Sequence, residues 1–211
     1  MKDFLDYTFD PAVCQKELRE FKKLLARKRE LSESQDILPF FRKRPQLSVF
    51  VASWFPGMDH FDRLAYEYSI FGDFTCDLAV GDSQSQTYCF VEFEDASSAS
   101  LFKTNPARAT LEWSPRFEHG FSQIVDWFWK LDDMRNTTVF QNQFGVGHVR
   151  YYGLLVLGRS IDLSLREQTR LRWRLEKGLV DSKPVFCVTL DELCHHLDRR
   201  LRHYGIQNGK V

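Results

Sequence analysis

The chain has 211 residues, of which 43% are hydrophobic and 15% aromatic, and its 29 Lys and Arg residues balance 29 Asp and Glu residues. This length favours one sizeable core over two independent domains, so we expect one domain with an N-terminal helical extension over residues 1–45. No apolar run approaches the length that crosses a bilayer, and the first residues, MKDFLDYTFD, are charged where a signal peptide is apolar, so we expect a soluble, cytoplasmic protein without membrane association.

Helices are predicted in the N-terminal part of the chain. Asp10 is a suitable N-cap and Pro11 suits the first helical position, and apolar residues then recur at helical spacing, which predicts a long basic helix over residues 10–31. A second helix is predicted over residues 32–44, because the proline that follows ends it. The β-branched and aromatic run QLSVFVASWF, residues 46–55, predicts a strand.

An antiparallel hairpin is predicted in the middle of the chain. FTCDLAVG, residues 74–81, and TYCFVEFE, residues 87–94, both have the composition of strands, and a polar turn joins them. From Ser114 the spacing of apolar residues becomes helical, which predicts a helix over residues 114–134.

The C-terminal part alternates between strands and helices. YYGLLVLG, residues 151–158, is a continuous apolar run typical of a buried central strand. A basic helix is predicted over residues 163–178, a short strand over 184–190 and a last helix over 190–205. The succession predicts a mixed α/β fold in which helices flank a central sheet.

Two glutamates stand on one face of the second hairpin strand. Because side chains alternate along a strand, Val91 and Phe93 share one face, and Phe90, Glu92 and Glu94 share the other. Like charges this close raise each other's pKa unless a cation or solvent relieves them. The pattern therefore indicates either an exposed sheet face or a metal site.

The acids of both hairpin strands have the spacing of a known nuclease site. Asp77, fourteen further residues and then Glu92-Phe93-Glu94 reproduce most of the PD-(D/E)xK pattern, in which acids from two paired strands meet. Two such carboxylates can hold Mg²⁺ or Mn²⁺, and the ion then polarises a phosphodiester and lowers the pKa of an attacking water. Acids on adjacent strands also occur by chance in many sheets.

Charge is distributed unevenly along the chain. Residues 58–100 contain one basic residue and nine acidic residues, whereas residues 1–57 contain eleven basic against eight acidic, and residues 101–211 contain seventeen against twelve. An acidic centre between basic flanks fits a metal site beside a phosphate-binding surface. Solvated helix faces produce the same pattern.

Several segments together resemble one protein family. CDLAV, FVEFEDA, SPRFEHGFSQIVDWFWKL, GLLVLGR and LDELCHHL are similar to the Shedu family of bacterial anti-phage defence proteins, over roughly residues 33–200. The resemblance implies a PD-(D/E)xK nuclease-like domain, which we place at residues 46–205, acting on DNA. It implies that Asp77 and Glu92 are metal ligands, that Gln123 faces the site, and that Glu33 is the acid contributed by a preceding helix.

The chain departs from the superfamily pattern at one position. Glu94 stands where the superfamily has lysine, so a cation has to come from elsewhere. Lys103, just beyond the strand, is the nearest candidate because this lysine migrates in the superfamily, and a solvated loop lysine is the alternative interpretation. We expect Glu94 to be a further ligand or to hold water, with Lys103 or Gln123 orienting the nucleophile.

The predicted DNA surface lies on the basic helices. We expect a homo-oligomer that contacts DNA through part of residues 22–29 and through the arginines of the later basic helix, Arg166, Arg170, Arg172 and Arg174. Their spacing means that only some of these arginines can share a face.

Other functions have less support in the sequence. The five cysteines are scattered, odd in number and without a CxxC pair, and the histidines lack zinc spacing. FGVGHV lacks the third glycine of a dinucleotide fingerprint, and neither GxxxxGK[ST] nor GxSxG occurs. Two alternatives to a nuclease stay open: a catalytically inactive module that binds DNA or a protein, and a structural α/β domain with acids on its surface.

Overall fold

The computed structural model describes residues 3–145, 147–180 and 183–208. A seven-stranded mixed sheet forms its centre, in the order β1-β2-β3-β4-β7-β9-β8. β4, β7 and β9 run parallel to one another, and the other neighbours are antiparallel. The strands are β1 (Leu5–Asp6), β2 (Arg63–Ile70), β3 (Phe74–Asp82), β4 (Thr87–Phe93), β7 (Arg150–Val156), β8 (Leu179–Val180) and β9 (Lys183–Val188).

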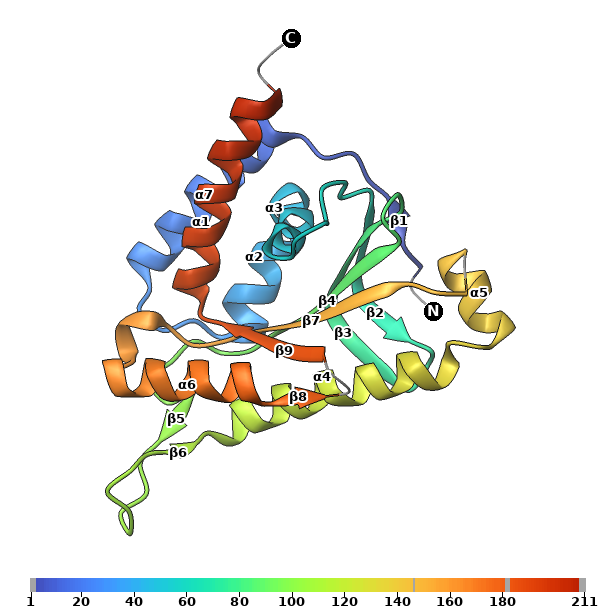
Figure 1. The fold of residues 1–211 in the computed structure, drawn as a ribbon. Helices are drawn as coiled ribbons and strands as arrows, with labels where there is room; N and C mark the ends of the chain where they lie inside the picture. Colours follow the sequence, from blue (N-terminus) through green and yellow to red (C-terminus); the bar gives the residue numbers. More distant parts are fainter. Residues whose placement is uncertain (1–2, 146, 181–182, 209–211) are drawn as a thin grey trace.

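Helices cover both faces of the sheet and make three layers (Figure 1). The first layer packs into one apolar cluster and contains α1 (Pro11–Arg27), α2 (Leu38–Arg42), α3 (Pro45–Phe50), the 3₁₀-helix η2 (Val51–Trp54) and α7 (Leu190–Asn208). The second layer packs into the other cluster and contains α4 (Pro115–Met134), α5 (Thr138–Phe144) and α6 (Leu165–Lys177). The mixed α/β fold is confirmed, and it is compatible with a PD-(D/E)xK core.

Three short elements complete the described residues. A π-helical turn, η1 (Glu33–Ile37), leads into α2, and a 3₁₀ turn, η3 (Ser160–Asp162), follows β7. A separate hairpin of β5 (Phe102–Lys103) and β6 (Glu112–Trp113) projects from the molecule below α6 in Figure 1. In the described parts of the chain, no helix is both long and apolar enough to cross a membrane.

Most of the predicted elements are confirmed. Asp10 caps α1 by accepting hydrogen bonds from the Ala12 and Val13 amides. The predicted hairpin is β3 and β4, and the helix predicted from Ser114 is α4. β7, α6, β9 and α7 follow in the predicted order.

The strand predicted over residues 46–55 is wrong, because this segment forms α3 and η2. Pro45 opens α3, where its missing amide hydrogen and fixed φ are tolerated. Leu47, Val49 and Val51 are fully buried, as are the residues between them. A segment buried on all sides shows no periodicity, so its apolar run could not distinguish a helix from a strand. The helix predicted over residues 32–44 begins as the π-turn η1, and β2, α5 and the β5–β6 hairpin were not predicted.

Glycine allows α4 to lie directly against the sheet. A Cβ atom added to Gly153 of β7 would lie 2.3 Å from Cγ2 of Ile124, and one added to Gly120 of α4 would lie 2.6 Å from Cδ1 of Leu155. Side chains at these points would push the helix away from the sheet. The close approach brings the polar residues of α4 to the end of β4.

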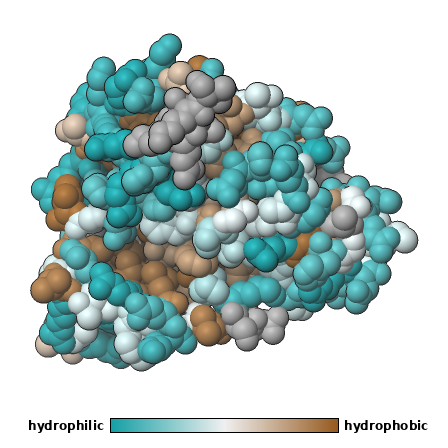
Figure 2. Space-filling model, turned by 45° about the horizontal axis from the view of Figure 1, so that its top comes forward, coloured by the Kyte–Doolittle hydropathy of each residue, from teal (hydrophilic) through white to brown (hydrophobic). Residues whose placement is uncertain are grey.

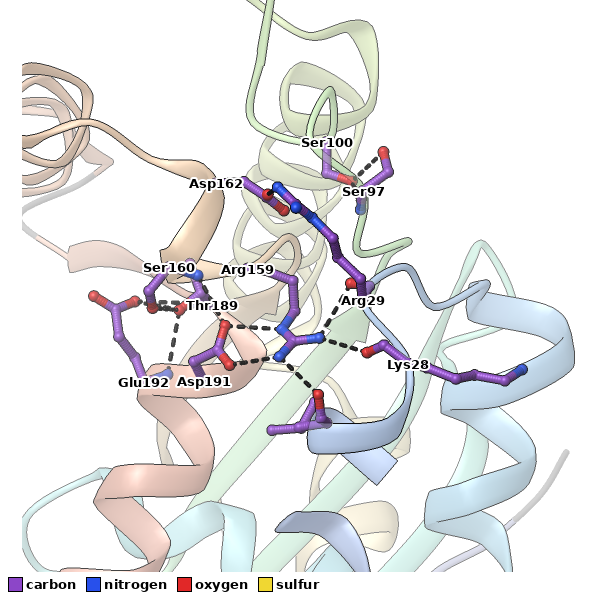
Figure 3. A network of polar contacts seen from close by, with 11 residues as sticks. Lys28, Arg29, Ser97, Ser100, Arg159, Ser160, Asp162, Thr189, Asp191 and Glu192 are labelled. Carbon is purple, nitrogen blue, oxygen red and sulfur yellow. Dashed lines mark hydrogen bonds and ion pairs between the residues drawn. The ribbon is translucent and has the colours of Figure 1, made fainter. Parts of the chain in front are cut away.

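A buried arginine links the end of α1 to the start of α7 (Figure 3). Arg159, which follows β7, is 5% exposed and donates two hydrogen bonds of 2.9 Å to Asp191 at the start of α7. It also donates to the carbonyl oxygens of Leu25, Lys28 and Arg29 at the end of α1, at 3.0, 2.8 and 3.1 Å. The guanidinium therefore satisfies carbonyls that the helix end leaves open and fixes the path of the chain toward η1.

Arg159→Ala should lower the free energy of unfolding by about 3 kcal/mol or more, because it removes the cation beside Asp191 and the donor for several carbonyls at the end of α1. Urea denaturation measures this change. Arg202→Ala is the matched control, since Arg202 is 72% exposed and pairs with Asp198 on the same helix, so it should change stability by less than about 1 kcal/mol. Equal, small effects of both substitutions would show that Arg159 does not anchor α1.

Candidate functional site

The β3–β4 ladder ends where the candidate acids begin. Its last pair at this end is Leu78 with Val91, and the same register places Asp77 opposite Glu92. Oδ2 of Asp77 accepts a hydrogen bond of 2.8 Å from the Phe93 amide, so a side chain continues the pairing that the backbone leaves. This bond fixes the Asp77 carboxylate beside the end of β4.

The alternation of side chains inverts at this level of the sheet. Leu78 of β3 packs in the first layer and Cys76 in the second, although residues two apart on a regular strand share a face. β2 shows the same inversion, centred on Glu67, which lies opposite Asp77 and has a positive φ of 49°. A left-handed backbone is unfavourable for glutamate and is found where a structure constrains a functional region.

Glu92 and Gln123 meet between β4 and α4. A side-chain hydrogen bond from Gln123 acts to lower the pKa of Glu92. Oε2 of Glu92 and Oε1 of Gln123 are buried, and neither has a hydrogen-bond partner within the described structure. Buried polar atoms are normally satisfied, so these two oxygens mark a place for a cation or for donating water molecules.

The carboxylates at this corner share one electrostatic environment. Burial, followed by the charges of neighbouring acids, raises the pKa of Glu92 to about 9 and that of Glu33 to about 7. Burial also raises the pKa of Asp77 to about 6, although the Phe93 amide opposes this change. The pKa of Glu94 is raised by burial too, against the opposing effect of Arg116. We call Glu33, Asp77, Glu92 and Glu94 the carboxylate cluster.

Arg116, in the first turn of α4, is the cation that contacts this cluster. Its Nη1 lies 2.7 Å from Oε2 of Glu94 and 3.9 Å from Oε2 of Glu33, and its Nη2 lies 2.9 Å from Oδ2 of Asp95. Glu94 is only 4% exposed, so its charge is compensated mainly by this guanidinium.

Glu33 reaches the cluster through contacts with the end of β4. The Glu33 amide donates a hydrogen bond of 2.6 Å to Oδ1 of Asp95. Leu31 and Ala96 exchange backbone hydrogen bonds of 2.9 and 2.8 Å, which hold the preceding segment in place. The structure thus brings Glu33, Asp77, Glu92, Glu94 and Gln123 together, and their roles as ligands or catalytic residues stay predictions.

Lys103 has a different partner from the one that was expected. It lies on β5, where its Nζ is 3.8 Å from Oε2 of Glu112 in the projecting hairpin. The charge beside Glu94 comes instead from Arg116. The sequence contained a signal for this residue, because Arg116 precedes Gln123 by seven positions and two helical turns place both on one face of α4.

The arginines of α6 differ in their surroundings. Arg174 pairs with both carboxylate oxygens of Glu118, at 2.6 and 2.7 Å. Arg170 donates to the Leu111 carbonyl and lies 4.9 Å from the centre of the Trp113 ring. Arg166 and Arg172 are exposed and line different grooves. Arg174 and Arg170 therefore hold α6 against α4 and the hairpin, which leaves Arg166 and Arg172 more open to a partner.

The cluster offers a small set of ligands for a divalent cation. Throughout the described residues, no three His, Cys, Asp or Glu side chains form a group able to hold a metal ion. Asp77 and Glu92 supply two carboxylates. Gln123, which interacts with Glu92, adds an amide oxygen that has no hydrogen-bond partner. Mg²⁺ is often held by one or two carboxylates together with water and substrate phosphate, so the residues present fit this ion.

A groove elsewhere on the molecule has a different character. It encloses about 620 Å³ between α6 and α7, and apolar residues gather in this hollow in Figure 2. Leu171, Leu175 and Val188 contribute to its walls, and His195 and Arg199 to its rim. A large apolar groove is often a binding site, but the carboxylate cluster combines several carboxyl groups of raised pKa with two buried oxygens that have no hydrogen-bond partner. We therefore place the candidate site at the cluster.

The stability of the metal-free protein should fall as pH rises from about 5 to about 9. Carboxyl groups titrate near 4.5 in the unfolded chain, whereas Glu33 and Glu92 have folded-state pKa values of about 7 and about 9. Between these values the folded protein binds more protons, and that stabilisation is lost as pH rises through the folded-state pKa.

Glu92→Gln, which cannot ionise, should flatten this dependence. Urea denaturation of both proteins in EDTA at pH 5, 7 and 9 measures it, and comparison with the parent protein cancels the other titrating groups. A pH dependence that is identical in the two proteins would show that Glu92 is not the buried acid described here.

Comparison with known proteins supports one family assignment. The family model of the Shedu protein SduA, C-terminal, matches residues 30–194. A search of curated proteins found no match. The matched region contains the whole carboxylate cluster, Gln123 and Arg116. The chain therefore belongs to the Shedu SduA C-terminal family, and this membership implies a nuclease-like protein with a role in anti-phage defence.

Proposed function

We propose that this chain is a metal-dependent DNA endonuclease that nicks or cleaves phosphodiesters in anti-phage defence. The observation that carries the proposal is the pair of Asp77 and Glu92 at the end of the β3–β4 ladder. Both acids have raised pKa values, Gln123 interacts with Glu92, and one oxygen of each of these two side chains is buried without a hydrogen-bond partner. Carboxylates this close repel one another when they are ionised, and a bound cation relieves the repulsion. Such groups are therefore typical of a functional site.

The proposal gives roles to Asp77, Glu92 and Glu33 of the cluster and to the neighbouring Gln123. Asp77 and Glu92 would hold Mg²⁺ or Mn²⁺, which would polarise the phosphodiester and make a bound water more acidic. Asp77 stays oriented by the Phe93 amide, and Gln123 is placed to accept a hydrogen bond from the attacking water. Glu33 lies at the edge of the cluster, where it adds negative charge that favours cation binding.

The projecting hairpin and α6 form the surface that we propose for DNA. Arg166 and Arg170 line a groove of about 860 Å³ together with Thr110 of the hairpin connection. The hairpin also contains Arg108, whose side chain is 68% exposed. Basic side chains around a groove bind phosphates irrespective of sequence. α6 contacts the first turns of α4 through the Arg174–Glu118 pair, so this surface adjoins the helix that bears Arg116 and Gln123.

A second candidate function is a catalytically inactive module that binds DNA or a protein partner. The observation that favours it is the identity of residue 94, a glutamate paired with Arg116 where the superfamily has lysine. Hydrolysis distinguishes the two functions. We propose that the nuclease acts in the cytoplasm as a homo-oligomer, because a nuclease that is toxic to its host needs control, which assembly can supply.

Divalent cations should bind to the parent protein and fail to bind to Asp77→Asn and Glu92→Gln. The amides keep the shape of each side chain, and Asp77→Asn can retain an acceptor for the Phe93 amide, so the fold should survive. Isothermal titration with Mn²⁺ measures binding. Asp73→Asn is the control, because Asp73 pairs with Lys130 at the β2–β3 turn and should leave the heats unchanged. Equal heats in all four proteins would show that Asp77 and Glu92 do not form the metal site.

Nicking of supercoiled plasmid DNA tests the activity itself. The parent protein should convert the plasmid with Mg²⁺ or Mn²⁺ and not with EDTA, and Glu92→Gln should lose at least about two orders of magnitude in rate. Single-stranded and linear DNA should be tested alongside. If the parent protein cuts no form of DNA with either ion, the catalytic proposal fails and the inactive module remains.

Arg166→Gln should flatten the salt dependence of DNA binding by about one unit of slope, because each phosphate contact releases about one counterion. Arg172→Gln is the matched control, since Arg172 is also exposed on α6 but lines the other groove. Fluorescence anisotropy between about 50 and 200 mM salt, with EDTA present, measures both slopes. A change for Arg172 alone would move the DNA surface to the α6–α7 side.

A further inference from the structure

The Arg116 guanidinium is anchored on one side and open on the other. Its two terminal nitrogens form ion pairs with Glu94 and Asp95 at 2.7 and 2.9 Å, and Glu33 lies 3.9 Å from Nη1, beyond hydrogen-bond distance. An arginine has five N–H donors, so these two contacts leave donors for another group. The Arg116 side chain is 42% exposed, whereas the side chain of Glu94 is 6% exposed, so part of the guanidinium is accessible to solvent.

The anchoring acids explain why a glutamate occupies position 94. Glu94 is buried against α4, with its Cγ 3.6 Å from the position that a Cβ atom of Gly120 would take. A buried carboxylate is costly unless a cation compensates it, and Arg116 provides that cation. Glu94 therefore determines where the guanidinium lies.

The position of Arg116 also favours an anionic ligand. It is the second residue of α4, a helix of 20 residues, so the positive end of the helix dipole lies near Glu94. Positive partial charge at a helix N-terminus attracts phosphate, and a guanidinium binds phosphate through two parallel N–H donors. Gln123 lies two turns further along the same face, beside Glu92.

We infer that Arg116 is the residue that binds the scissile phosphate, and that Glu94 and Asp95 are positioning residues that hold it there. This inference rests on the proposed nuclease function, because it gives the pair of Glu94 and Arg116 the task that a lysine at position 94 would have. The positive charge is therefore carried by a side chain of α4 that lies beside the end of β4, and not by a side chain of β4 itself. Lys103, which is paired with Glu112 in the hairpin, has no part in it.

Substitution of Arg116 separates phosphate binding from metal binding. Arg116→Gln should reduce plasmid nicking by about 100-fold or more, the effect of losing a donor that stabilises transition-state charge. Mn²⁺ binding measured by titration should persist, because Asp77 and Glu92 are unchanged. Without metal, the slope of DNA affinity against salt should fall by about one unit. Arg116→Lys, which keeps the charge, should restore part of the rate.

Three further variants separate this role from a purely structural one. Glu94→Gln/Arg116→Gln removes the buried charge of Glu94 together with its cation, so it should fold better than Arg116→Gln alone and still be as inactive. Glu94→Lys/Arg116→Gln returns a cation to the strand and should recover nicking. Arg202→Gln, on the distant end of α7, should nick at the parental rate.

The outcomes are separable from those of the proposed function. Metal-dependent nicking by the parent protein, together with a parental rate in the folded Glu94→Gln/Arg116→Gln variant, would overturn the role of Arg116 and leave the nuclease intact. Loss of nicking together with an unchanged salt slope would also overturn phosphate binding by Arg116. A parent protein that cuts no DNA with any ion would remove the proposed function and this inference with it.

Discussion

The central constraint on the structure is a group of carboxylates that lie close together at the end of the β3–β4 ladder, where they are largely withdrawn from water. Asp77 and Glu92 face each other there, with Glu33 and Glu94 beside them, and burial is the largest cause of the raised pKa of each group. Such a cluster opposes folding at neutral pH unless protons or cations compensate it. Arg116 neutralises the charge of Glu94. Oε2 of Glu92 has no hydrogen-bond partner, so it is available to an ion.

The surrounding fold holds these acids at close range. Gly153 lets α4 approach the sheet, which places the amide of Gln123 over β4. Arg159 fixes the end of α1, and the backbone pair of Leu31 with Ala96 then leads the chain to Glu33. The sheet, α4 and the segment that carries Glu33 therefore each contribute a part of one corner, and the apolar residues of α1 and α2 pack into the same first-layer cluster as α7.

Local patterns in the sequence predicted the parts of this architecture that depend on local physics. Alternation along β4 put Glu92 and Glu94 on one face, and helical spacing identified α4. The failures arose where tertiary contacts decide. The segment after Pro45 is buried on every side, so it reads like a strand and folds as a helix. Arg116 was missed because its partners, Glu94 and Asp95, are distant in sequence and only the packing of α4 reveals them.

The most direct test of the account is a crystal structure of the parent protein grown with Mn²⁺, with anomalous scattering recorded to locate the metal. The account predicts one anomalous peak between the Asp77 and Glu92 carboxylates, with Glu94 still paired to Arg116. A crystal in which Asp77 and Glu92 bind no metal at saturating Mn²⁺ would contradict the account. So would one in which the ion binds elsewhere while both acids form hydrogen bonds within the protein.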